Sequence, residues 1–424
     1  MLKKISIVDL RVGMHLHALE GAWIDHPFWR SKFVVRDPAD VAKLQGSAVA
    51  EVWIDPALGL DVAEPADAQP ALRAPVAAGG DTGAAAARKD SLPAAAAPAM
   101  PTPTRSINDE LHEAAAICNR GRTAVLAMFN EARMGRSVST AGAMPLVAEI
   151  SESVQRNPSA LVSLARLKNK DDYSFMHSVA VCALMVVTAR QIGMNEEECR
   201  EAGLAGLMHD LGKAVMPLDV LNKPGKLTDA EFEIIRTHPE RGHWLLKEGE
   251  GASDKVLDVV LNHHEKMDGT GYPRRMPAEK ISTLARLGAI CDVYDAITSN
   301  RPYKRGWDPA ESIARMAGFK GHFDPVLFGV FVKSLGIYPT GCVVRLESGR
   351  LAVVIEQNAQ ALVSPIVKVF HSVRSDMPIP AKLVDLAEAS CNDRIVGREA
   401  GADQRFPQLV ELWAEPAALR RTQR

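Results

Sequence analysis

"HHEKMDGTGYP" occupies residues 263–273 and places two adjacent histidines before a carboxylate and a Gly-rich turn. Imidazole and carboxylate side chains are ligands that first-row transition metals prefer. The following "DGTGYP" predicts a tight turn, in which Asp268 anchors the chain and Gly269 and Gly271 are free to take positive φ. We expect this turn to place Tyr272 at the rim of a site. We interpret the turn as serving structure and partner contact more than catalysis.

Histidines cluster in the region that leads up to this turn. Of the chain's twelve histidines, six lie between residues 177 and 264: His177, His209, His238, His243, His263 and His264. A lone histidine on an apolar helix face is more often a core residue than a ligand, but several of these stand beside acidic residues. In "GLMHDLGK", residues 206–213, the two carboxylate oxygens of Asp210 can bridge two cations. Taken alone, the pair His209 and Asp210 is also consistent with the polar end of a helix that stops at Gly212.

A second acidic pair follows the turn. Asp292 and Asp295 in "DVYDAITS" are three residues apart, so a helix places them on one face. Two carboxylates on an otherwise apolar helix are costly to bury unless they bind a cation or hydrogen-bond donors. We therefore predict that one of the two is a metal ligand and that the other is a structural partner.

The region around these residues is predicted to be mainly α-helical, from residue 105 to residue 335. Apolar residues recur at helical spacing after Ser106, which is a good N-cap, and Gly193 is a plausible helix stop. Before this region, residues 1–62 predict a small β-rich regulatory domain, and the Ala/Pro-rich residues 63–104 predict a disordered linker. After it, residues 336–424 predict a small β-rich extension with strands around Glu-Ser-Gly and in "SPIVKVF".

Composition excludes several classes of protein. Lys and Arg number 50 and Asp and Glu number 52, so the net charge of −2 gives no footprint for binding DNA. The six cysteines are scattered, which favours reduced thiols in a cytoplasmic protein over disulfides or a zinc ribbon. No run of about 18 apolar residues predicts a membrane span, and the first residues are typical of a strand rather than a signal peptide.

Five ordered motifs resemble those of the HD-GYP family, a bacterial branch of the HD phosphohydrolases. They are His177, "HDLGK" (209–213), "HPERG" (238–242), "HHEKMDGTGYP" (263–273) and "DVYDAITSNRPYK" (292–304). The resemblance covers residues 155–335, and the first 60 residues resemble a small domain of uncharacterised function that precedes HD-GYP in one subfamily. It implies a helical HD-type phosphohydrolase domain flanked by small β-rich units.

The resemblance also implies a metal-dependent phosphodiesterase that hydrolyses cyclic di-GMP to pGpG through a metal-bridging hydroxide, with onward cleavage to GMP left open. Lys213 matches a lysine near the scissile phosphate, and Arg301 and Lys304 match residues that contact the substrate phosphates. Tyr272 belongs to the Gly-Tyr-Pro triplet that gives the family its name. Seven residues match metal ligands, with Asp210 bridging: His177, His209, Asp210, His238, His263, His264 and Asp292.

We expect two divalent metals, with iron or manganese favoured and nickel or zinc open. Family members with three metals carry a Glu where this chain has Tyr173, which argues against a third ion. Two alternatives stay open: a weakly active cyclic di-GMP sensor, and a phosphohydrolase of another cyclic dinucleotide. Protein partners are expected to contact the GYP loop or the N-terminal domain, and a homodimer is open.

Overall fold

The computed structural model describes two compact units, Met1–Ser91 and Leu92–Arg424. The described residues are 2–19, 33–35, 37–38, 41, 45, 51–60, 103–167, 173–223, 225–299, 306–358, 360–399 and 401–414. Arg301, Lys304 and almost all of the predicted linker lie outside them.

The N-terminal unit contains a small antiparallel sheet with the strand order β1-β4-β2-β3. Alternating apolar residues such as Leu16, Val52 and Ile54 turn one face inward, and Leu10 and Met14 complete its core. The β-rich character predicted for this end of the chain is confirmed. The strands are β1 (Lys3–Ser6), β2 (His15–Leu19), β3 (Phe33–Val34) and β4 (Glu51–Ile54), with the 3-10 turn η1 (Ile7–Asp9) after β1.

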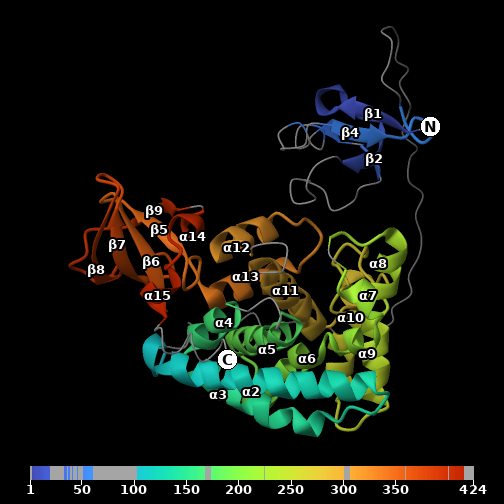
Figure 1. The fold of residues 1–424 in the computed structure, drawn as a ribbon, viewed down its shortest axis with the longest axis horizontal. Helices are drawn as coiled ribbons and strands as arrows, with labels where there is room; N and C mark the ends of the chain where they lie inside the picture. The colour runs from blue at the N-terminus through green and yellow to red at the C-terminus, as the bar shows by residue number, and fades with distance from the viewer. Residues whose placement is uncertain are drawn as a thin grey trace, which may run out of the picture. The chain divides into compact units, whose positions relative to one another are not determined.

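The second unit begins with helices, and the mainly α fold that the sequence predicts is confirmed (Figure 1). The long helix α2 packs across α3, α4 and α5. Within the described residues, short 3-10 turns connect the helices: η3 (Thr140–Gly142), η5 (Leu211–Val215) and η6 (Ala278–Lys280). The helices are α2 (Ile107–Arg133), α3 (Met144–Arg156), α4 (Pro158–Ala165), α5 (Tyr173–Ile192), α6 (Glu196–Met208), α7 (Leu218–Leu221), α8 (Asp229–Ile235), α9 (His238–Lys247), α10 (Asp254–Asn262), α11 (Thr283–Thr298), α12 (Pro309–Ala317) and α13 (Pro325–Leu335).

Local sequence signals explain where many of these helices begin and end. The Ser106 side chain accepts a hydrogen bond from the Asp109 backbone N–H, so its predicted N-cap role is confirmed. Asn195 and Glu198 form a reciprocal capping box at the start of α6. Gly193 has φ of +91° directly after α5, which confirms the predicted stop.

Helix α5 lies at the centre of the helical unit and packs against α2, α4, α6, α11 and α13. Apolar side chains surround it on every side, so it is buried rather than amphipathic. Phe175–Ile192 is long and apolar enough to cross a membrane, but 83% of this window is buried inside the unit. The apolar surface of the helix is thus used in the protein core, where it positions its neighbours α6 and α11.

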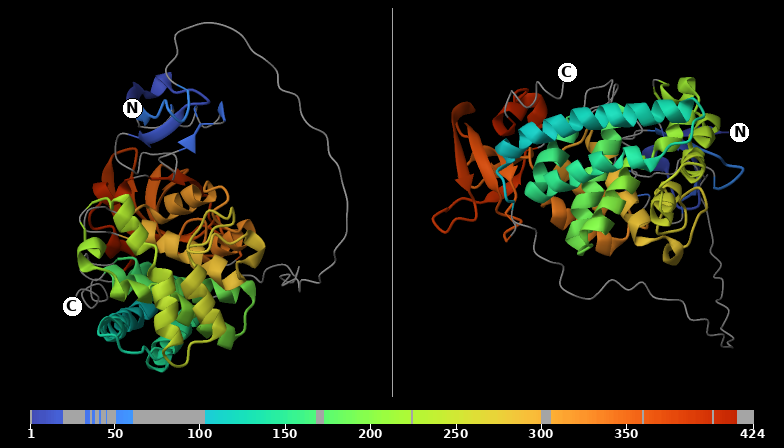
Figure 2. Two further views of the ribbon diagram at one scale, coloured as in Figure 1. Left: turned by 90° about the vertical axis from the view of Figure 1, so that its right-hand side faces the viewer. Right: turned by 90° about the horizontal axis from the view of Figure 1, so that it is seen from below.

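The chain ends in a five-stranded antiparallel sheet with the order β8-β7-β6-β5-β9, at one end of the helical layer (Figure 2). Two strands and two short helices were not predicted from the sequence: β8, β9, α14 and α15. Pro378 and Pro380 lie in β8, an edge strand, where a missing N–H costs least. The elements are β5 (Val343–Leu346), β6 (Arg350–Glu356), β7 (Ile366–Ser372), β8 (Met377–Asp385), β9 (Ile395–Arg398), α14 (Ala402–Arg405) and α15 (Val410–Trp413).

One face of this sheet shares the core of the helical unit. Leu351 and Val353 of β6, Phe370 of β7 and Trp413 of α15 belong to the same apolar cluster as Phe331 of α13. A separate small cluster fills the other side of the sheet. Helices and sheet therefore form one packed body.

A buried ion pair fastens the start of α2 to the end of α3. Glu110 has no exposed surface, and its oxygens accept hydrogen bonds from Arg156 Nη2 at 2.7 Å, Arg156 Nε at 2.8 Å and Ser153 Oγ at 2.8 Å. Because Glu110→Ala leaves this guanidinium without its partner, we expect a loss of about 3 kcal/mol in the free energy of unfolding. Chemical denaturation measures it.

The matched control is Glu113→Ala, three residues along the same helix. Glu113 pairs with Arg120 at 3.0 Å, but both side chains are nearly half exposed. Water screens such a pair, so we expect a loss of less than about 1 kcal/mol. Equal losses for the two variants would contradict the assigned role of Glu110.

Candidate metal centre

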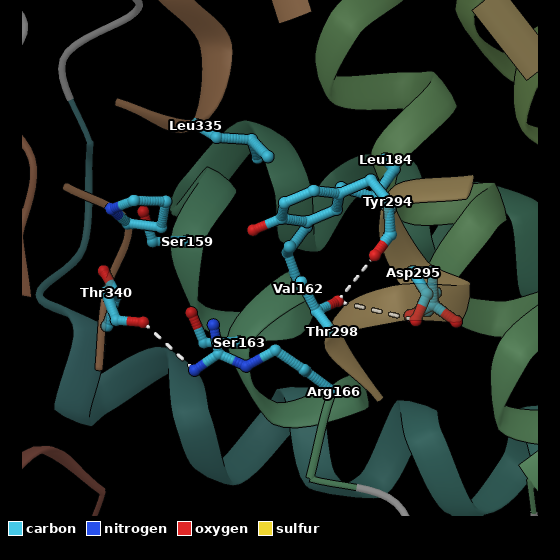
Figure 3. A pocket seen from close by; sticks show the side chains of 12 residues that line it. Ser159, Val162, Ser163, Arg166, Leu184, Tyr294, Asp295, Thr298, Leu335 and Thr340 are labelled. Atoms are coloured by element: carbon cyan, nitrogen blue, oxygen red, sulfur yellow. Dashed lines mark hydrogen bonds between the residues drawn. The ribbon is translucent and has the colours of Figure 1, made fainter. Parts of the chain in front are cut away.

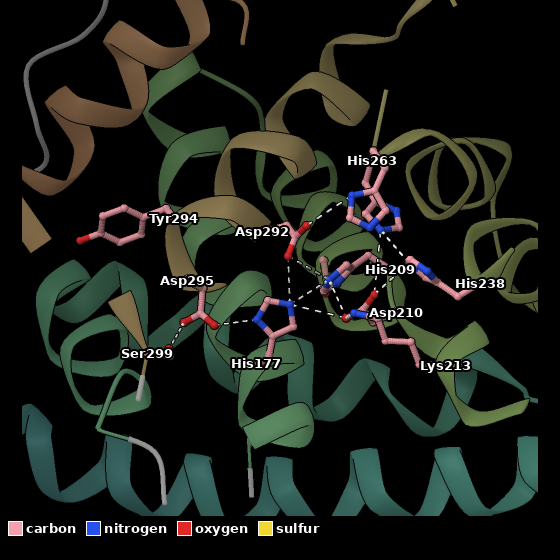
Figure 4. A network of polar contacts seen from close by, with 12 residues as sticks. His177, His209, Asp210, Lys213, His238, His263, Asp292, Tyr294, Asp295 and Ser299 are labelled. Carbon is pink, nitrogen blue, oxygen red and sulfur yellow. Dashed lines mark hydrogen bonds and ion pairs between the residues drawn. The ribbon is translucent and has the colours of Figure 1, made fainter. Parts of the chain in front are cut away.

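Seven side chains, from three helices and from the residues directly after α6 and α10, meet in the interior of the helical unit; Figure 4 labels six of them. Helix α5 provides His177, and the residues directly after α6 are His209 and Asp210. Six of the seven are buried, and only His264 is partly exposed. The structure brings together all seven residues that were predicted as ligands: His177, His209, Asp210, His238, His263, His264 and Asp292.

The seven residues form two groups. One contains Asp210, His238, His263 and His264, and the other contains His177, His209 and Asp292, with the ligand atoms of each group within 4.8 Å of one another. Asp210 reaches both groups. Its Oδ1 lies 3.2 Å from His238 Nε2, whereas its Oδ2 lies 3.4 Å from His209 Nε2 and 3.5 Å from His177 Nε2. This position suits a carboxylate that bridges two cations.

Backbone contacts fix the tautomers of three histidines. The Nδ1 atoms of His209, His238 and His263 lie 2.8, 2.8 and 3.0 Å from carbonyl oxygens, which can only accept hydrogen bonds. Each Nδ1 therefore carries the proton in the neutral ring, and each Nε2 presents a lone pair.

The Nε2 atoms of these rings lie close to one another and to that of His177. His209 Nε2 is 3.2 Å from His177 Nε2, and His238 Nε2 is 3.3 Å from His263 Nε2. Asp210 Oδ1 is buried and accepts no hydrogen bond from the described residues, although His238 Nε2 is close. Facing lone pairs repel unless a cation lies between them. This donor set therefore fits divalent metals better than it fits a hydrogen-bonded core.

The ionisation of three of these residues favours neutral imidazoles and a charged carboxylate. Burial, together with the neighbouring His209 and His238, lowers the pKa of His263 to about 3. Burial also lowers the pKa of His264 well below its usual value. For Asp210, burial raises the pKa, but Lys213 and His209 outweigh it and hold the pKa well below its usual value. At neutral pH these groups are therefore ready to act as ligands.

Asp295 orients the His177 ring through its Nδ1 atom. Its Oδ2 lies 2.6 Å from His177 Nδ1, and its Oδ1 accepts a hydrogen bond from Ser299 Oγ. Burial lowers the pKa of His177, but Asp292 and Asp295 outweigh it and raise the pKa. Asp295 thus lies where a structural partner of the ligand set is expected, because such a carboxylate fixes the ring and its tautomer.

Asp295→Ala is expected to weaken metal binding by about 10- to 100-fold, because His177 loses the carboxylate that orients its ring. Isothermal titration of the metal-free protein measures the affinity. Asp295→Asn keeps a hydrogen-bond acceptor for His177 Nδ1–H, so its metal affinity should fall less. A loss equal to that of the alanine variant would mean that charge, not orientation, is what Asp295 supplies.

A small cavity lies beside α11, and Asp295 is among the residues that line it (Figure 3). Ser163 and Arg166 line it across from Tyr294 and Thr298, and Arg166 donates a hydrogen bond to the Thr340 carbonyl oxygen at 3.3 Å. None of the seven clustered residues lines this cavity. We therefore assign it no part in the chemistry of the site.

Gly212 does not end a helix, which corrects the alternative that the sequence left open. Helix α6 ends at Met208, and Gly212 lies inside η5. A Cβ atom at this position would lie 1.9 Å from the His238 carbonyl oxygen. The glycine is required because the backbone of α9 passes directly over η5, which sets His238 beside Asp210.

The GYP turn is held by two carboxylates. Asp268 accepts hydrogen bonds from the Thr270 N–H and hydroxyl, which agrees with its expected anchoring role. The buried Glu265, which was not recognised from the sequence, accepts from the backbone N–H groups of Arg274 at 2.7 Å and Met276 at 3.0 Å. Its position directly after the histidine pair is the only signal that the sequence offers.

The two glycines of the turn serve different purposes. Gly269 has φ of +70°, as expected. Gly271 does not have a positive φ, so that expectation was wrong. A Cβ there would lie 2.5 Å from Glu265 Cα, so the glycine is needed for the close approach of two backbone segments. This contact seats Tyr272, whose ring stacks on His264 with 4.5 Å between centroids.

Comparisons with known proteins identify the family. A family model described as HD domain matches residues 150–327, and a domain of unknown function (DUF3391) matches residues 2–143. The cyclic di-GMP phosphodiesterase of Pseudomonas aeruginosa is 51% identical over 415 residues, 97% of this chain and 96% of that protein. The chain belongs to the HD-GYP family.

Other relatives match a smaller share of the chain. The cyclic di-GMP phosphodiesterase response regulator of Xanthomonas campestris is 37% identical over 188 residues, 42% of this chain and 48% of that protein. The 3'3'-cGAMP-specific phosphodiesterase 1 of Vibrio cholerae is 36% identical over 167 residues, 39% of this chain and 38% of that protein. HD-GYP relatives thus include proteins named for two different cyclic dinucleotides.

Proposed function

We propose that this HD-GYP protein is a metal-dependent phosphodiesterase that hydrolyses cyclic di-GMP to pGpG. The observation that carries the proposal is the meeting of two His/Asp donor groups at Asp210. The name of the relative from Pseudomonas aeruginosa, which aligns along nearly the whole chain, supports the choice of substrate.

Each group at the site has a distinct role in this proposal. Divalent ions held by the seven residues would supply Lewis-acid charge for the phosphoryl group and for the attacking water. Lys213 Nζ lies 2.5 Å from Asp210 Oδ2. The Lys213 side chain is one quarter exposed, so its ammonium faces the edge of the site. There it neutralises charge that develops on the phosphoryl oxygens. Arg301 and Lys304 remain proposed contacts to the substrate phosphates.

We propose two metal ions per chain, iron or manganese in preference to nickel or zinc. Seven residues with one bridging carboxylate leave positions for water and phosphate on two six-coordinate ions. The position of the family Glu is Tyr173 here, and neither its side chain nor Asp172 is among the described residues. The proposed count therefore rests on the sequence at that position.

A second substrate has specific support. The Vibrio cholerae relative named for 3'3'-cGAMP is 36% identical over 167 residues, so a hybrid cyclic dinucleotide is the alternative substrate. A weakly active sensor is the other alternative, in which the GYP loop or the N-terminal unit contacts a protein partner or a second copy. We also propose a cytoplasmic location, which the six free cysteines support.

Turnover by anaerobically purified, metal-loaded protein tests these proposals together. Cyclic di-GMP, 3′3′-cGAMP and cyclic di-AMP are offered separately, products are separated by chromatography, and metals are counted by elemental analysis. We expect two ions per chain and pGpG from cyclic di-GMP at the highest kcat/KM. Binding without turnover would support the sensor, and three tightly bound ions would contradict the binuclear proposal.

Lys213→Ala should keep both metals but slow hydrolysis of cyclic di-GMP by about 10²-fold or more, because a charge contact to the transition state is lost. Steady-state kinetics and metal content measure the two effects. Lys255→Ala is the control, since Lys255 also pairs with a carboxylate, Glu201 at 2.8 Å, but is more than half exposed. A wild-type rate for Lys213→Ala would refute its proposed role.

A further inference from the structure

A stacked column of side chains extends outward from the metal centre to its rim. The Tyr272 ring lies against His264 at 4.5 Å with an interplanar angle of 30°. Arg236 stacks on the Tyr272 ring, with its guanidinium carbon 5.0 Å from the ring centroid. Phe232 meets Tyr272 edge-on at 6.4 Å. The Arg236 guanidinium is thus separated from His264, a proposed metal ligand, by the Tyr272 ring.

The charge on Arg236 is already balanced. Arg236 Nη1 donates to Glu233 Oε1 at 2.6 Å, and these side chains are 23% and 66% exposed. An unpaired arginine at the rim would favour a phosphate. The Arg236–Glu233 pair has no net charge and offers both hydrogen-bond donors and acceptors, which match the edge of a nucleobase. The partly exposed ring of Phe232 beside it offers a surface on which the face of the base can stack.

We propose that Arg236, with Glu233 as its partner, recognises a guanine base of the dinucleotide, an inference that rests on the proposed function. Guanine presents two acceptors, O6 and N7, to the guanidinium fork, whereas adenine presents an N6 amino group that opposes a donor. The carboxylate of Glu233 accepts from guanine N–H groups. Arg236 is thereby a specificity residue for guanine over adenine.

A purely packing role for Arg236 makes a different prediction. If Arg236 only held Tyr272 against His264, its loss would disturb the metal ligand and impair all substrates equally. A base contact changes the ratio between substrates, acts mainly on KM and leaves the metals in place. The ratio of kcat/KM for cyclic di-GMP to that for cyclic di-AMP, which has no guanine, therefore separates the two roles.

The experiment compares the metal-loaded full chain with Arg236→Gln and Arg236→Lys. Glutamine can pair with adenine, and lysine keeps the charge without the planar fork. For both variants we expect kcat/KM on cyclic di-GMP to fall about 5- to 150-fold, with a smaller fall on cyclic di-AMP and unchanged metal content. Arg405→Gln is the matched control, because Arg405 also stacks on an aromatic ring, Phe406 at 5.1 Å, but in the C-terminal sheet region.

Equal losses on both substrates, or loss of metal from the variants, would overturn the inference in favour of packing. The proposed function fails separately, if the wild-type chain does not hydrolyse cyclic di-GMP. In that case calorimetric binding of cyclic di-GMP and cyclic di-AMP still decides the inference: an unchanged affinity ratio in Arg236→Gln would refute it, and a ratio shifted toward cyclic di-AMP would support it.

Discussion

Asp210→Ala is expected to release both metals and to lower kcat/KM for cyclic di-GMP by about 10³-fold or more. Asp210 is the residue whose two oxygens face the two histidine groups, at 3.2 Å from His238 Nε2 and 3.4 Å from His209 Nε2. Without it, each group keeps imidazoles but loses the shared negative charge. Several kcal/mol of transition-state stabilisation should disappear with the ions.

Elemental analysis and steady-state kinetics on the same preparation measure this loss. Asp219→Ala is the control, because Asp219 is an exposed aspartate of α7 close in sequence to Asp210. Circular dichroism establishes whether Asp210→Ala is still folded. A folded variant that retains both ions and hydrolyses the substrate would show that another group holds the metals.

Gly212→Ala is expected to destabilise the helical unit by about 4 kcal/mol, a size found where a core is overpacked without room to relax. Its Cβ would lie 1.9 Å from the His238 carbonyl oxygen and 2.5 Å from the Gly242 backbone nitrogen. Both are backbone atoms, so no side chain can turn aside. Helix α9 would have to move, and His238 would leave Asp210 with it.

Thermal denaturation and metal titration test this expectation. Gly329→Ala is the matched control, because Gly329 lies in α13, is exposed, and has open space where its Cβ would be. Alanine should stabilise that helix by about 0.5–1 kcal/mol. If Gly212→Ala were as stable as the wild type, the close packing of η5 and α9 would be wrong.

Features that depend on neighbours in sequence could be predicted. The N-cap at Ser106 and the stop at Gly193 are set by groups within a few residues, so the sequence contains all that is needed. The seven clustered residues were found because metal chemistry restricts ligands to a few residue types and the motifs are ordered along the chain. Their roles as ligands remain a prediction.

Features that depend on contacts distant in sequence could not be predicted. Gly212 and Gly271 were assigned to helix termination and positive φ, but both are required where two backbone segments nearly touch. Glu265 gave no sign that it would bind two N–H groups beyond the turn. Strand β8 was missed because its prolines argue against a strand, and only the sheet order shows that it is an edge.

The shared core of helices and sheet limits where this protein can be shortened. A chain that stopped after Leu335 would keep all seven clustered residues, yet it would lose Leu351, Val353 and Trp413 from the apolar cluster that contains Phe331 and Leu335. Such a bared apolar surface promotes aggregation. Poor solubility of that fragment would therefore reflect a missing part of its interior rather than a defect in the metal centre.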